Sequence, residues 1–400
     1  MENRNALLTI IVVQFVCAIN WYTFSSVFSL IASDLHQNVS GLGLVTTTFV
    51  LGVAVFQLPA GLVAAKHGPK KALVVGTLLI AVSSILIGLV DQVILLTLLR
   101  LVEGIGEAFT FGPGVILVTR YFKKGSEGLG IGFYSATFDI GAVVGISGWA
   151  VLGGVVGWRV SMIMGGVLAL GACAFLLLLV PRDTSDEAFS VRFSELKAVI
   201  MNKWLLILSA GLITEQICFS TNLYFMVYYL EESLRVAAGV AGAVGGVTVV
   251  VSILASPLAG RAFDRSRRPK TAFIVFCFAA AGGLAIAAVA SVYAALLSGV
   301  IVGAATSAAY IFGISIARTI SGVREEYGPL KLSWINGIAF LGGVWAPLVF
   351  SGVAAGPGYS LAWALIAILL VVITMPVFLL RSGTRNTFGS PAGGPDTAPG

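Results

Sequence analysis

Five ionisable side chains interrupt otherwise apolar stretches of this sequence and are its best candidates for chemistry. They are Arg100, Glu103, Glu107, Asp139 and Glu215. An ionised side chain at the centre of a bilayer costs at least about 2.5–3.5 kcal/mol, so each group needs a partner, a hydrated cavity or a neutralising proton. Ionising four acids beside one arginine would leave a net charge of −3. Burial and mutual repulsion favour the neutral form, so we expect at least one carboxyl group to be protonated at neutral pH and to exchange its proton.

Helical spacing places three of these residues on one face. At about 100° per residue, Glu103 lies about 60° from Arg100 and Glu107 about 20° from it. The spacing of Arg100 and Glu103 also suits a purely structural ion pair. Glu107 and Asp139 both lie near the middle of an apolar stretch and are therefore the first candidates for the proton carrier. Asp139 has an alternative role, in which it only caps or locks a neighbouring helix, whereas the isolation of Glu215 from basic residues favours a functional role.

The composition requires a membrane around these residues. Hydrophobic residues make up 58% of the 400 residues and charged residues only 10%, whereas soluble domains average about 25% charged residues. These values exclude a soluble enzyme, a disordered chain and a secreted disulfide scaffold. The net charge of +6 does not indicate a nucleic-acid partner, because its distribution follows the apolar stretches.

Twelve apolar segments are each about long enough to cross a bilayer as a helix. The expected spans are 7–31, 41–64, 72–90, 93–119, 128–152, 159–180, 204–230, 236–258, 271–290, 293–317, 332–352 and 359–380. With the N-terminus inside, 21 Lys and Arg residues fall on the inner side and two, Arg159 and Arg235, on the outer side. This distribution follows the positive-inside rule and predicts a multi-pass protein of the inner cell membrane with both termini in the cytoplasm.

The chain divides into two similar halves. We expect a six-helix bundle in 1–180, a linker with a short amphipathic helix in 181–203, a second six-helix bundle in 204–380 and a disordered cytoplasmic tail in 381–400. An offset of 199 residues relates Gly61 to Gly260, Lys66 to Arg265, Lys71 to Lys270 and Gly104 to Gly303. Six spans in each half keep the same orientation, so the repeat is a parallel duplication.

The chain resembles the major facilitator superfamily of secondary transporters, of the prokaryotic type, over essentially its whole length. The loop after the second span resembles the family's G-x-x-x-D-R/K-x-G-R/K-R/K motif. The matching residues are Gly61, Lys66, Gly68, Lys70 and Lys71 in the first copy and Gly260, Asp264 and Arg265 in the second. Arg100, Gly104 and Gly106, and the Gly157-Trp158-Arg159 sequence, also resemble family motifs. The resemblance implies two bundles that rock about a central cavity and a cytoplasmic latch at this loop. Ala65 replaces the usual aspartate, so the first copy lacks the carboxylate of the latch.

The resemblance further implies that the first, fourth, seventh and tenth spans line the cavity, and the polar residues of the sequence gather in these spans. Candidate substrate contacts are Gln14, Asn20, Tyr22, Asn222 and Tyr310, with Trp334 and Asn336 of the eleventh span as weaker candidates. Each aromatic residue has packing as its alternative role.

We expect a secondary transporter that moves a small organic solute by alternating access, coupled to protons as a symporter. The alternatives are a multidrug exporter (a drug:proton antiporter) and a non-transporting membrane receptor. The antiporter is disfavoured because Ile146, Trp149 and Ala150 replace the proline and the last glycines of the family's antiporter motif. An enzyme is not expected, nor is a cofactor or a metal, because no nucleophile–base pair or ligand cluster emerges. The expected partners are the solute, protons and the lipid bilayer, with the protein acting as a monomer.

Overall fold

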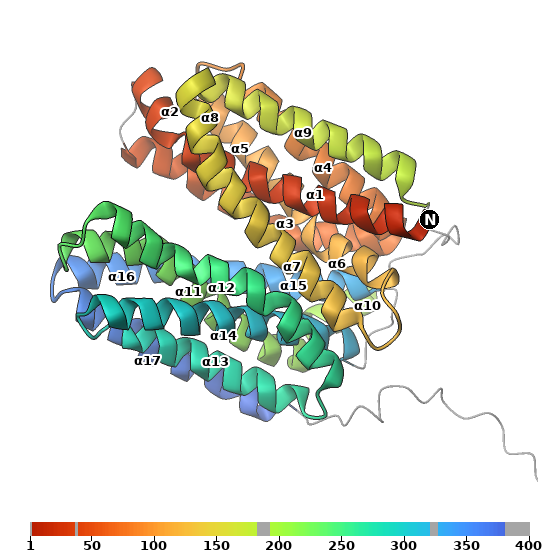
Figure 1. The fold of residues 1–400 in the computed structure, drawn as a ribbon. Coiled ribbons are helices and arrows are strands. Elements are labelled where there is room, and N and C mark those ends of the chain that lie inside the picture. The colour runs from red at the N-terminus through yellow and green to blue at the C-terminus, as the bar shows by residue number, and fades with distance from the viewer. Residues whose placement is uncertain (1, 37–38, 182–192, 321–326, 381–400) are drawn as a thin grey trace, which may run out of the picture.

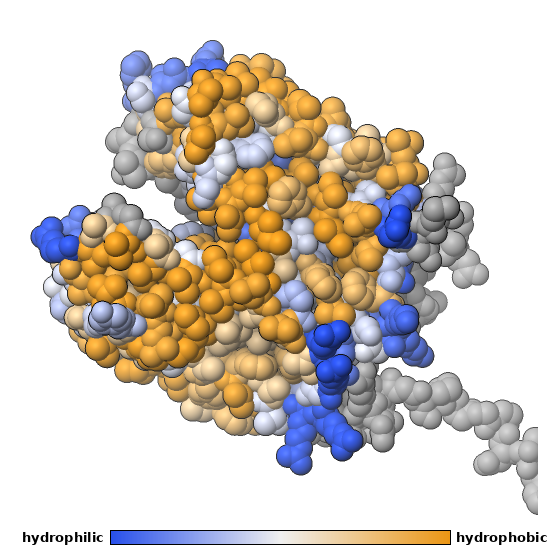
Figure 2. All heavy atoms as spheres, viewed as in Figure 1, coloured by the Kyte–Doolittle hydropathy of each residue, from blue (hydrophilic) through white to orange (hydrophobic). Residues whose placement is uncertain are grey.

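The computed structural model describes residues 2–36, 39–181, 193–320 and 327–380, and within these ranges the chain forms helices and no strand. The helices make two bundles that lie side by side, with α1–α9 in the first and α11–α17 in the second (Figure 1). In these ranges, ten helices are long and apolar enough to cross a membrane. Large apolar side chains cover much of the surface, as expected of a face that meets lipid (Figure 2).

The helices of the two bundles follow the expected spans closely. The first bundle consists of α1 (Glu2–Ser26), α2 (Phe28–Asp34), α3 (Val39–His67), α4 (Pro69–Ile87), α5 (Val93–Ala108), α6 (Phe111–Arg120), α7 (Glu127–Val143), the π-helix η1 (Val144–Gly148), α8 (Trp149–Val156) and α9 (Trp158–Leu179). The second consists of α11 (Lys203–Glu232), α12 (Ala238–Arg265), α13 (Pro269–Ile286), α14 (Val292–Thr319), α15 (Gly328–Gly343), α16 (Ala346–Ala355), α17 (Tyr359–Thr374) and the 3-10 helix η3 (Met375–Leu379).

Between the bundles, α10 (Phe193–Ile200) is a short helix in the expected linker, and it contacts α15. The first part of that linker and the expected disordered tail, 381–400, lie outside the described residues. The domain limits at 180 and 204 fall next to the end of α9 and the start of α11. We propose that they remain the limits of the two domains.

The fourth and eleventh spans are broken, which the sequence analysis did not predict. The fourth span breaks between α5 and α6, and the eleventh between α15 and α16. Pro113 and Pro347 follow these breaks, and a proline ring collides with the carbonyl group four residues earlier in a continuous helix. Pro59 and Pro257 lie inside continuous helices, so proline alone is not sufficient. The break in the fourth span follows Glu107 directly and therefore shapes its surroundings.

The duplication recurs as a pair of equivalent close contacts. A Cβ atom at Gly104 would lie 2.1 Å from the carbonyl oxygen of Phe49, and one at Gly303 would lie 2.4 Å from that of Thr248. The same offset of 199 residues relates both partners of one contact to those of the other. In each bundle a glycine therefore lets two helices approach until their backbones touch.

The two bundles touch at one end and separate at the other. The α7 helix packs on α12 and α3 packs on α15. Gly128 meets Gly260, and Gly61 meets Leu330, at distances that leave no room for a side chain. At the opposite end, which carries α2 and α16, the space-filling view shows the surface hollowed between the bundles (Figure 2).

The start of α9 is tied to its neighbours at the open end of the first bundle. Arg159 forms ion pairs with Asp34 and Asp91, and the indole N–H of Trp158 donates a hydrogen bond to Asp34 at 3.1 Å. The hydrogen bonds from Arg159 and Trp158 hold the pKa of Asp34 below its ordinary value. Arg159 thus links the ends of the first, third and sixth spans, which stabilises the bundle.

We predict that Gly104→Ala lowers the midpoint of thermal unfolding in detergent, because the new methyl group collides with the backbone of α3. Overpacking of this kind costs about 1–3 kcal/mol. Gly171→Ala in α9 is the matched control, since a Cβ there would meet nothing within 4 Å. An unchanged midpoint for Gly104→Ala would contradict the tight contact.

Candidate functional site

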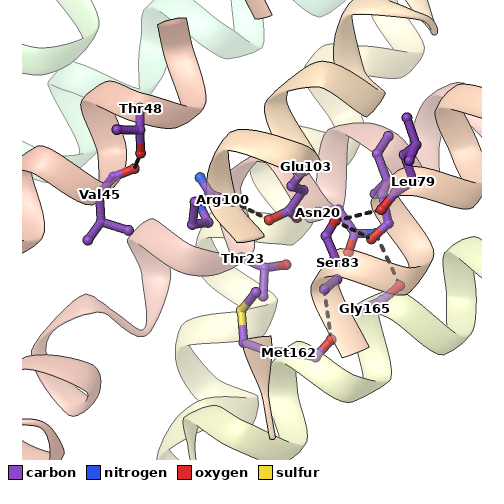
Figure 3. Close-up of polar contacts among 12 residues, drawn as sticks. Asn20, Thr23, Val45, Thr48, Leu79, Ser83, Arg100, Glu103, Met162 and Gly165 are labelled. Carbon is purple, nitrogen blue, oxygen red and sulfur yellow. Dashed lines mark hydrogen bonds and ion pairs between the residues drawn. The ribbon is translucent and has the colours of Figure 1, made fainter. Parts of the chain in front are cut away.

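Arg100 and Glu103 form an enclosed ion pair inside the first bundle. The guanidinium Nη1 lies 2.7 Å from Glu103 Oε2, and the two side chains are 1% and 0% exposed (Figure 3). The guanidinium carbon also lies 4.0 Å from the ring centre of Phe49 and 4.7 Å from that of Phe24. The carboxylate and the two aromatic faces together compensate the buried cation. This arrangement supports the structural interpretation of the pair.

Glu107 is buried without a cation. It is 3% exposed, and one oxygen, Oε2, accepts a hydrogen bond of 3.4 Å from the hydroxyl of Thr110. The other oxygen has no hydrogen-bond partner among the described residues. Glu107 also lies in the last turn of α5, where the helix dipole presents its negative end. A charge here is unfavourable, so the surroundings favour a carboxyl group that holds a proton.

A hydrogen bond from another span supports the backbone at the break after Glu107. The carbonyl oxygen of Thr110 accepts a hydrogen bond from the hydroxyl of Tyr134 at 3.2 Å, in addition to the bond of 3.0 Å from the backbone N–H of Gly114 four residues later. These contacts hold α5 and α6 together against α7. Glu107 therefore lies next to a break whose backbone is held by one neighbouring span, that of α7.

Asp139 connects the two bundles. The hydroxyl of Ser252 in α12 donates a hydrogen bond of 2.6 Å to its carboxyl group, which lies in α7. Asp139 is partly exposed, in contrast to Glu103 and Glu107. This contact fits the structural interpretation, in which Asp139 locks a neighbouring helix. It also fits a proton carrier whose titration changes a contact between the bundles.

Glu215 is the acid of the second bundle, and it lies close to Asp139. It is 8% exposed and forms no hydrogen bond or ion pair with any described residue. Asp139 is within electrostatic range of it, and both acids are within such range of Tyr310. Tyr22 of the first bundle is likewise close to Asp139 and Glu107. The structure therefore brings the acids of α7 and α11 into one region at the contact between the bundles, whereas Glu107 of α5 shares with them only its proximity to Tyr22.

Aromatic side chains from both bundles gather in this region. The ring of Trp21 lies 4.9 Å from Phe49, 5.7 Å from Phe138 and 5.8 Å from Phe340, centre to centre. Phe340 belongs to α15, so this aromatic cluster spans the contact between the bundles. Tyr22 extends the cluster, with its ring 6.3 Å from that of Phe138.

Two of the expected cavity residues are used in packing instead. The amide of Asn20 donates to the carbonyl oxygens of Val16 and Gly165, which ties α1 to α9 (Figure 3). Asn222 accepts a hydrogen bond of 2.6 Å from the hydroxyl of Thr248 and donates a longer one to Ser298. Both asparagines are fully buried, so these bonds explain their presence in apolar helices.

The remaining expected cavity residues differ in their burial and contacts. Gln14 and Asn336 are buried in α1 and α15. Trp334 and Gln14 each have one buried polar atom without a hydrogen-bond partner among the described residues. Tyr310 packs against Phe111, with 5.5 Å between ring centres. Tyr310 is also within electrostatic range of Glu215 and Asp139.

Three residues near the acids were not predicted from the sequence. Thr110 and Tyr134 surround the break after Glu107, and Ser252 binds Asp139. A single hydroxyl residue in an apolar stretch gives no sequence signal of its own. The Gly112-Pro113-Gly114 sequence, which predicts an interrupted helix, could have drawn attention to Thr110.

The loop motif forms a contact between the bundles in its second copy. The two carboxylate oxygens of Asp264 accept hydrogen bonds of 2.9 Å from the backbone N–H groups of Gly128 and Leu129 in the first turn of α7. A carboxylate is favoured at the positive end of a helix. At the equivalent position of the first copy, Ala65 has no carboxylate to offer to α15, whose second residue is Pro329 and has no N–H.

The expected equivalence of Lys71 and Lys270 in the two halves is wrong. Lys70, not Lys71, makes the contacts that correspond to those of Lys270. The ammonium group of Lys70 donates to the carbonyl oxygens of Leu177 and Val180, and that of Lys270 donates to those of Phe378 and Leu380. Each lysine is the second residue of its helix, at an offset of 200 residues. One residue inserted in the second loop shifts the register that fixed spacing predicted.

The other residues of the motif are either exposed or required for the backbone conformation of the loop. Lys66, Lys71 and Arg265 are exposed at the end where the bundles touch. Gly68 has a φ of +89° just before α4, a conformation that other residues rarely adopt.

The described residues contain no group of three or more His, Cys, Asp or Glu side chains that could hold a metal. The four cysteines are buried and free.

Three comparisons place these features among known proteins. The family model of the Major Facilitator Superfamily matches residues 10–231. The probable sulfoacetate transporter SauU of Cupriavidus necator is 28% identical over 200 residues, which cover 50% of this chain and 46% of that protein. The chain thus spans less than half the length of the curated relatives it matches first.

Two solved structures share the fold over nearly the whole chain. The transporter FucP in its outward conformation has a TM-score of 0.74 at 15% identity, covering 96% of this chain and 100% of that one. The proton:xylose symporter XylE, bound to 6-bromo-6-deoxy-D-glucose, has a TM-score of 0.76 at 13% identity, covering 95% and 96%. These likenesses confirm the predicted all-helical membrane fold of twelve spans in two bundles. The chain belongs to the Major Facilitator Superfamily, a family of multi-pass membrane transporters and not of enzymes.

Proposed function

We propose that this protein is a secondary transporter that carries a small organic solute together with protons, as a symporter, by alternating access. The observation that carries the proposal is Glu107, a buried carboxyl group with no cation beside it and one long hydrogen bond. A group in such surroundings is stable when neutral and unstable when charged, so its proton can follow the conformation of the protein. The likeness to a proton:xylose symporter supports the same coupling ion.

The shape of the two bundles supports the alternating-access part of the proposal. The bundles touch at the end that carries the exposed cations Lys66 and Arg265 and are hollowed at the other end (Figure 2). The positive-inside rule assigns the cationic end to the cytoplasm, with both termini there. The structure is then open to the outside of the inner membrane. Inward opening requires the contacts of α7 with α12, and of α3 with α15, to separate.

Asp139 and Glu215 complete the proposed site from the two sides of the contact between the bundles. The hydrogen bond from Ser252 to Asp139 must break or lengthen when the bundles rock, which gives protonation of Asp139 a way to influence the motion. Arg100 is paired with Glu103 and acts as a fixed part of the first bundle.

We predict that Glu107→Gln abolishes proton uptake coupled to solute transport, because the amide cannot release a proton. The measurement uses proteoliposomes with an internal pH dye and a solute identified by a library uptake screen. Concentrative uptake driven by a pH gradient is lost in the variant, whereas counterflow of solute without a gradient is retained.

Glu232→Gln is the matched control, since Glu232 is an exposed residue at the end of α11. Proton uptake that survives in Glu107→Gln would contradict the proposed role. Solute binding without flux in the native protein would instead favour the receptor, and proton movement opposite to the solute would favour the exporter.

We also predict that Asp264→Ala opens the cytoplasmic end more often, because α7 loses two hydrogen bonds to a carboxylate. A loss of about 1.4 kcal/mol raises the open population about ten-fold. The probe is maleimide labelling of Ser256→Cys, a buried position beside Gly132 of α7, after replacement of the four native cysteines. Arg265→Ala is the control. Equal labelling rates in Asp264→Ala and the control would contradict the latch.

A further inference from the structure

The one cation at the depth of the site is not available to a solute. Among the described residues, Arg100 is the single Lys or Arg more than four residues from the ends of its helix. Its guanidinium is enclosed by Glu103 and by the rings of Phe24 and Phe49. A carboxylate or sulfonate entering from the hollow would lose its water without gaining a counter-ion.

The acids of the site, by contrast, have no cationic partner among the described residues. Glu215 is more than nine-tenths buried and has no hydrogen bond or ion pair among the described residues. Asp139, within electrostatic range of it, accepts one hydrogen bond from a neutral hydroxyl. Neither acid is compensated by the protein, so a positive charge brought to this place would be stabilised by both.

The aromatic cluster supplies a second, independent indication of a cation. Trp21, Phe138 and Phe340 present π-systems from both bundles, and Trp21 is only partly buried. Tyr22 and Tyr310 lie within electrostatic range of Asp139 and are also partly buried. Aromatic faces attract alkylammonium groups, and this attraction grows when the groups are removed from water.

The same site offers fewer hydrogen-bonding groups to a sugar-like solute. Polyhydroxylated solutes are held by amide and carboxyl groups that remain free to hydrogen-bond. The amide N–H groups of Asn20 and the amide of Asn222 are already bonded to the protein, and both residues are fully buried, including the unbonded Oδ1 of Asn20. The groups within electrostatic range of Asp139 include the hydroxyls of Tyr22 and Tyr310 and the carboxyl group of Glu215.

We propose that the transported solute is a small organic cation, an alkylammonium group held between the aromatic cluster and the carboxyl groups of Glu215 and Asp139. This inference rests on the proposed function and names the substrate class of that site. Glu215 supplies the counter-charge, Asp139 adds to it from the other bundle, and Trp21, Tyr22 and Phe340 cover the apolar part of the solute. Glu107, which is separately enclosed, keeps the role of proton carrier.

The test is equilibrium binding to the purified full chain in detergent, followed by tryptophan fluorescence and by the shift of the thermal midpoint. Choline, 3,3-dimethylbutan-1-ol and 3,3-dimethylbutanoate have nearly the same shape and differ in charge. We expect choline to bind at least ten-fold more tightly than the neutral and anionic analogues. Sulfoacetate and D-xylose, which represent the solutes named for the relatives, are expected not to bind.

Variants separate the counter-charge from a structural effect. Glu215→Gln weakens choline binding at least ten-fold, whereas Glu215→Asp, which keeps the charge, retains a measurable part of it. Asp139→Asn weakens binding less than Glu215→Gln does, and Glu232→Gln leaves it unchanged.

Tighter binding of the anionic or neutral analogue, or undiminished binding to Glu215→Gln, would overturn the inference. So would the failure of both choline and the bulkier tetraethylammonium to bind. Cation binding without proton-coupled flux would uphold this inference and overturn the proposed function. Proton-coupled flux of a neutral or anionic solute would do the reverse.

Discussion

The expense of placing a charge in a low-dielectric interior governs the architecture of this protein. The first bundle reduces this cost in two different ways within eight residues of one span. Arg100 and Glu103 neutralise one another and are surrounded by aromatic rings. Glu107, two turns further along, has no such partner and is stable in its neutral form. The same span therefore contains a permanent ion pair, which stabilises the bundle, and an acid whose charge depends on its surroundings.

The break in the fourth span gives this difference a structural cause. Pro113 has no N–H to donate to the carbonyl oxygen of Phe109, and Tyr134 of α7 supports the break by donating a hydrogen bond to the next carbonyl oxygen, that of Thr110. Glu107 consequently sits at the end of a helix and next to α7, the element that also carries Asp139 and the contact with Asp264. The hydrogen bond that supports the break, Asp139 and the contact with Asp264 thus all lie on one helix. The latch itself is asymmetric, since Ala65 and Pro329 leave the equivalent contact of the other half without a carboxylate and without one N–H.

Periodicity and charge distribution predicted most of the fold, because twelve apolar stretches and short basic loops admit few arrangements. The duplication was also visible, and the offset that relates Gly104 to Gly303 reappears as two equivalent backbone contacts. The breaks at Pro113 and Pro347 were not predicted, since Pro59 and Pro257 lie in helices that continue. Within the site, the pairing of Arg100 with Glu103 followed from spacing. The use of Asn20 and Asn222 in packing could not, because which neighbouring helix an amide reaches depends on the tertiary contacts.

The proposed site combines groups that no single segment contains: acids from α5, α7 and α11 and aromatic rings from α1, α7 and α15. The central claim is that Glu107 holds a proton at neutral pH when the protein is open to the outside. Infrared difference spectroscopy of the purified protein, which detects the C=O stretch of protonated carboxyl groups, tests this most directly. The account predicts a protonated-carboxyl band in the native protein at neutral pH that disappears in Glu107→Gln. An identical band in both proteins, or its absence from the native one, would contradict it.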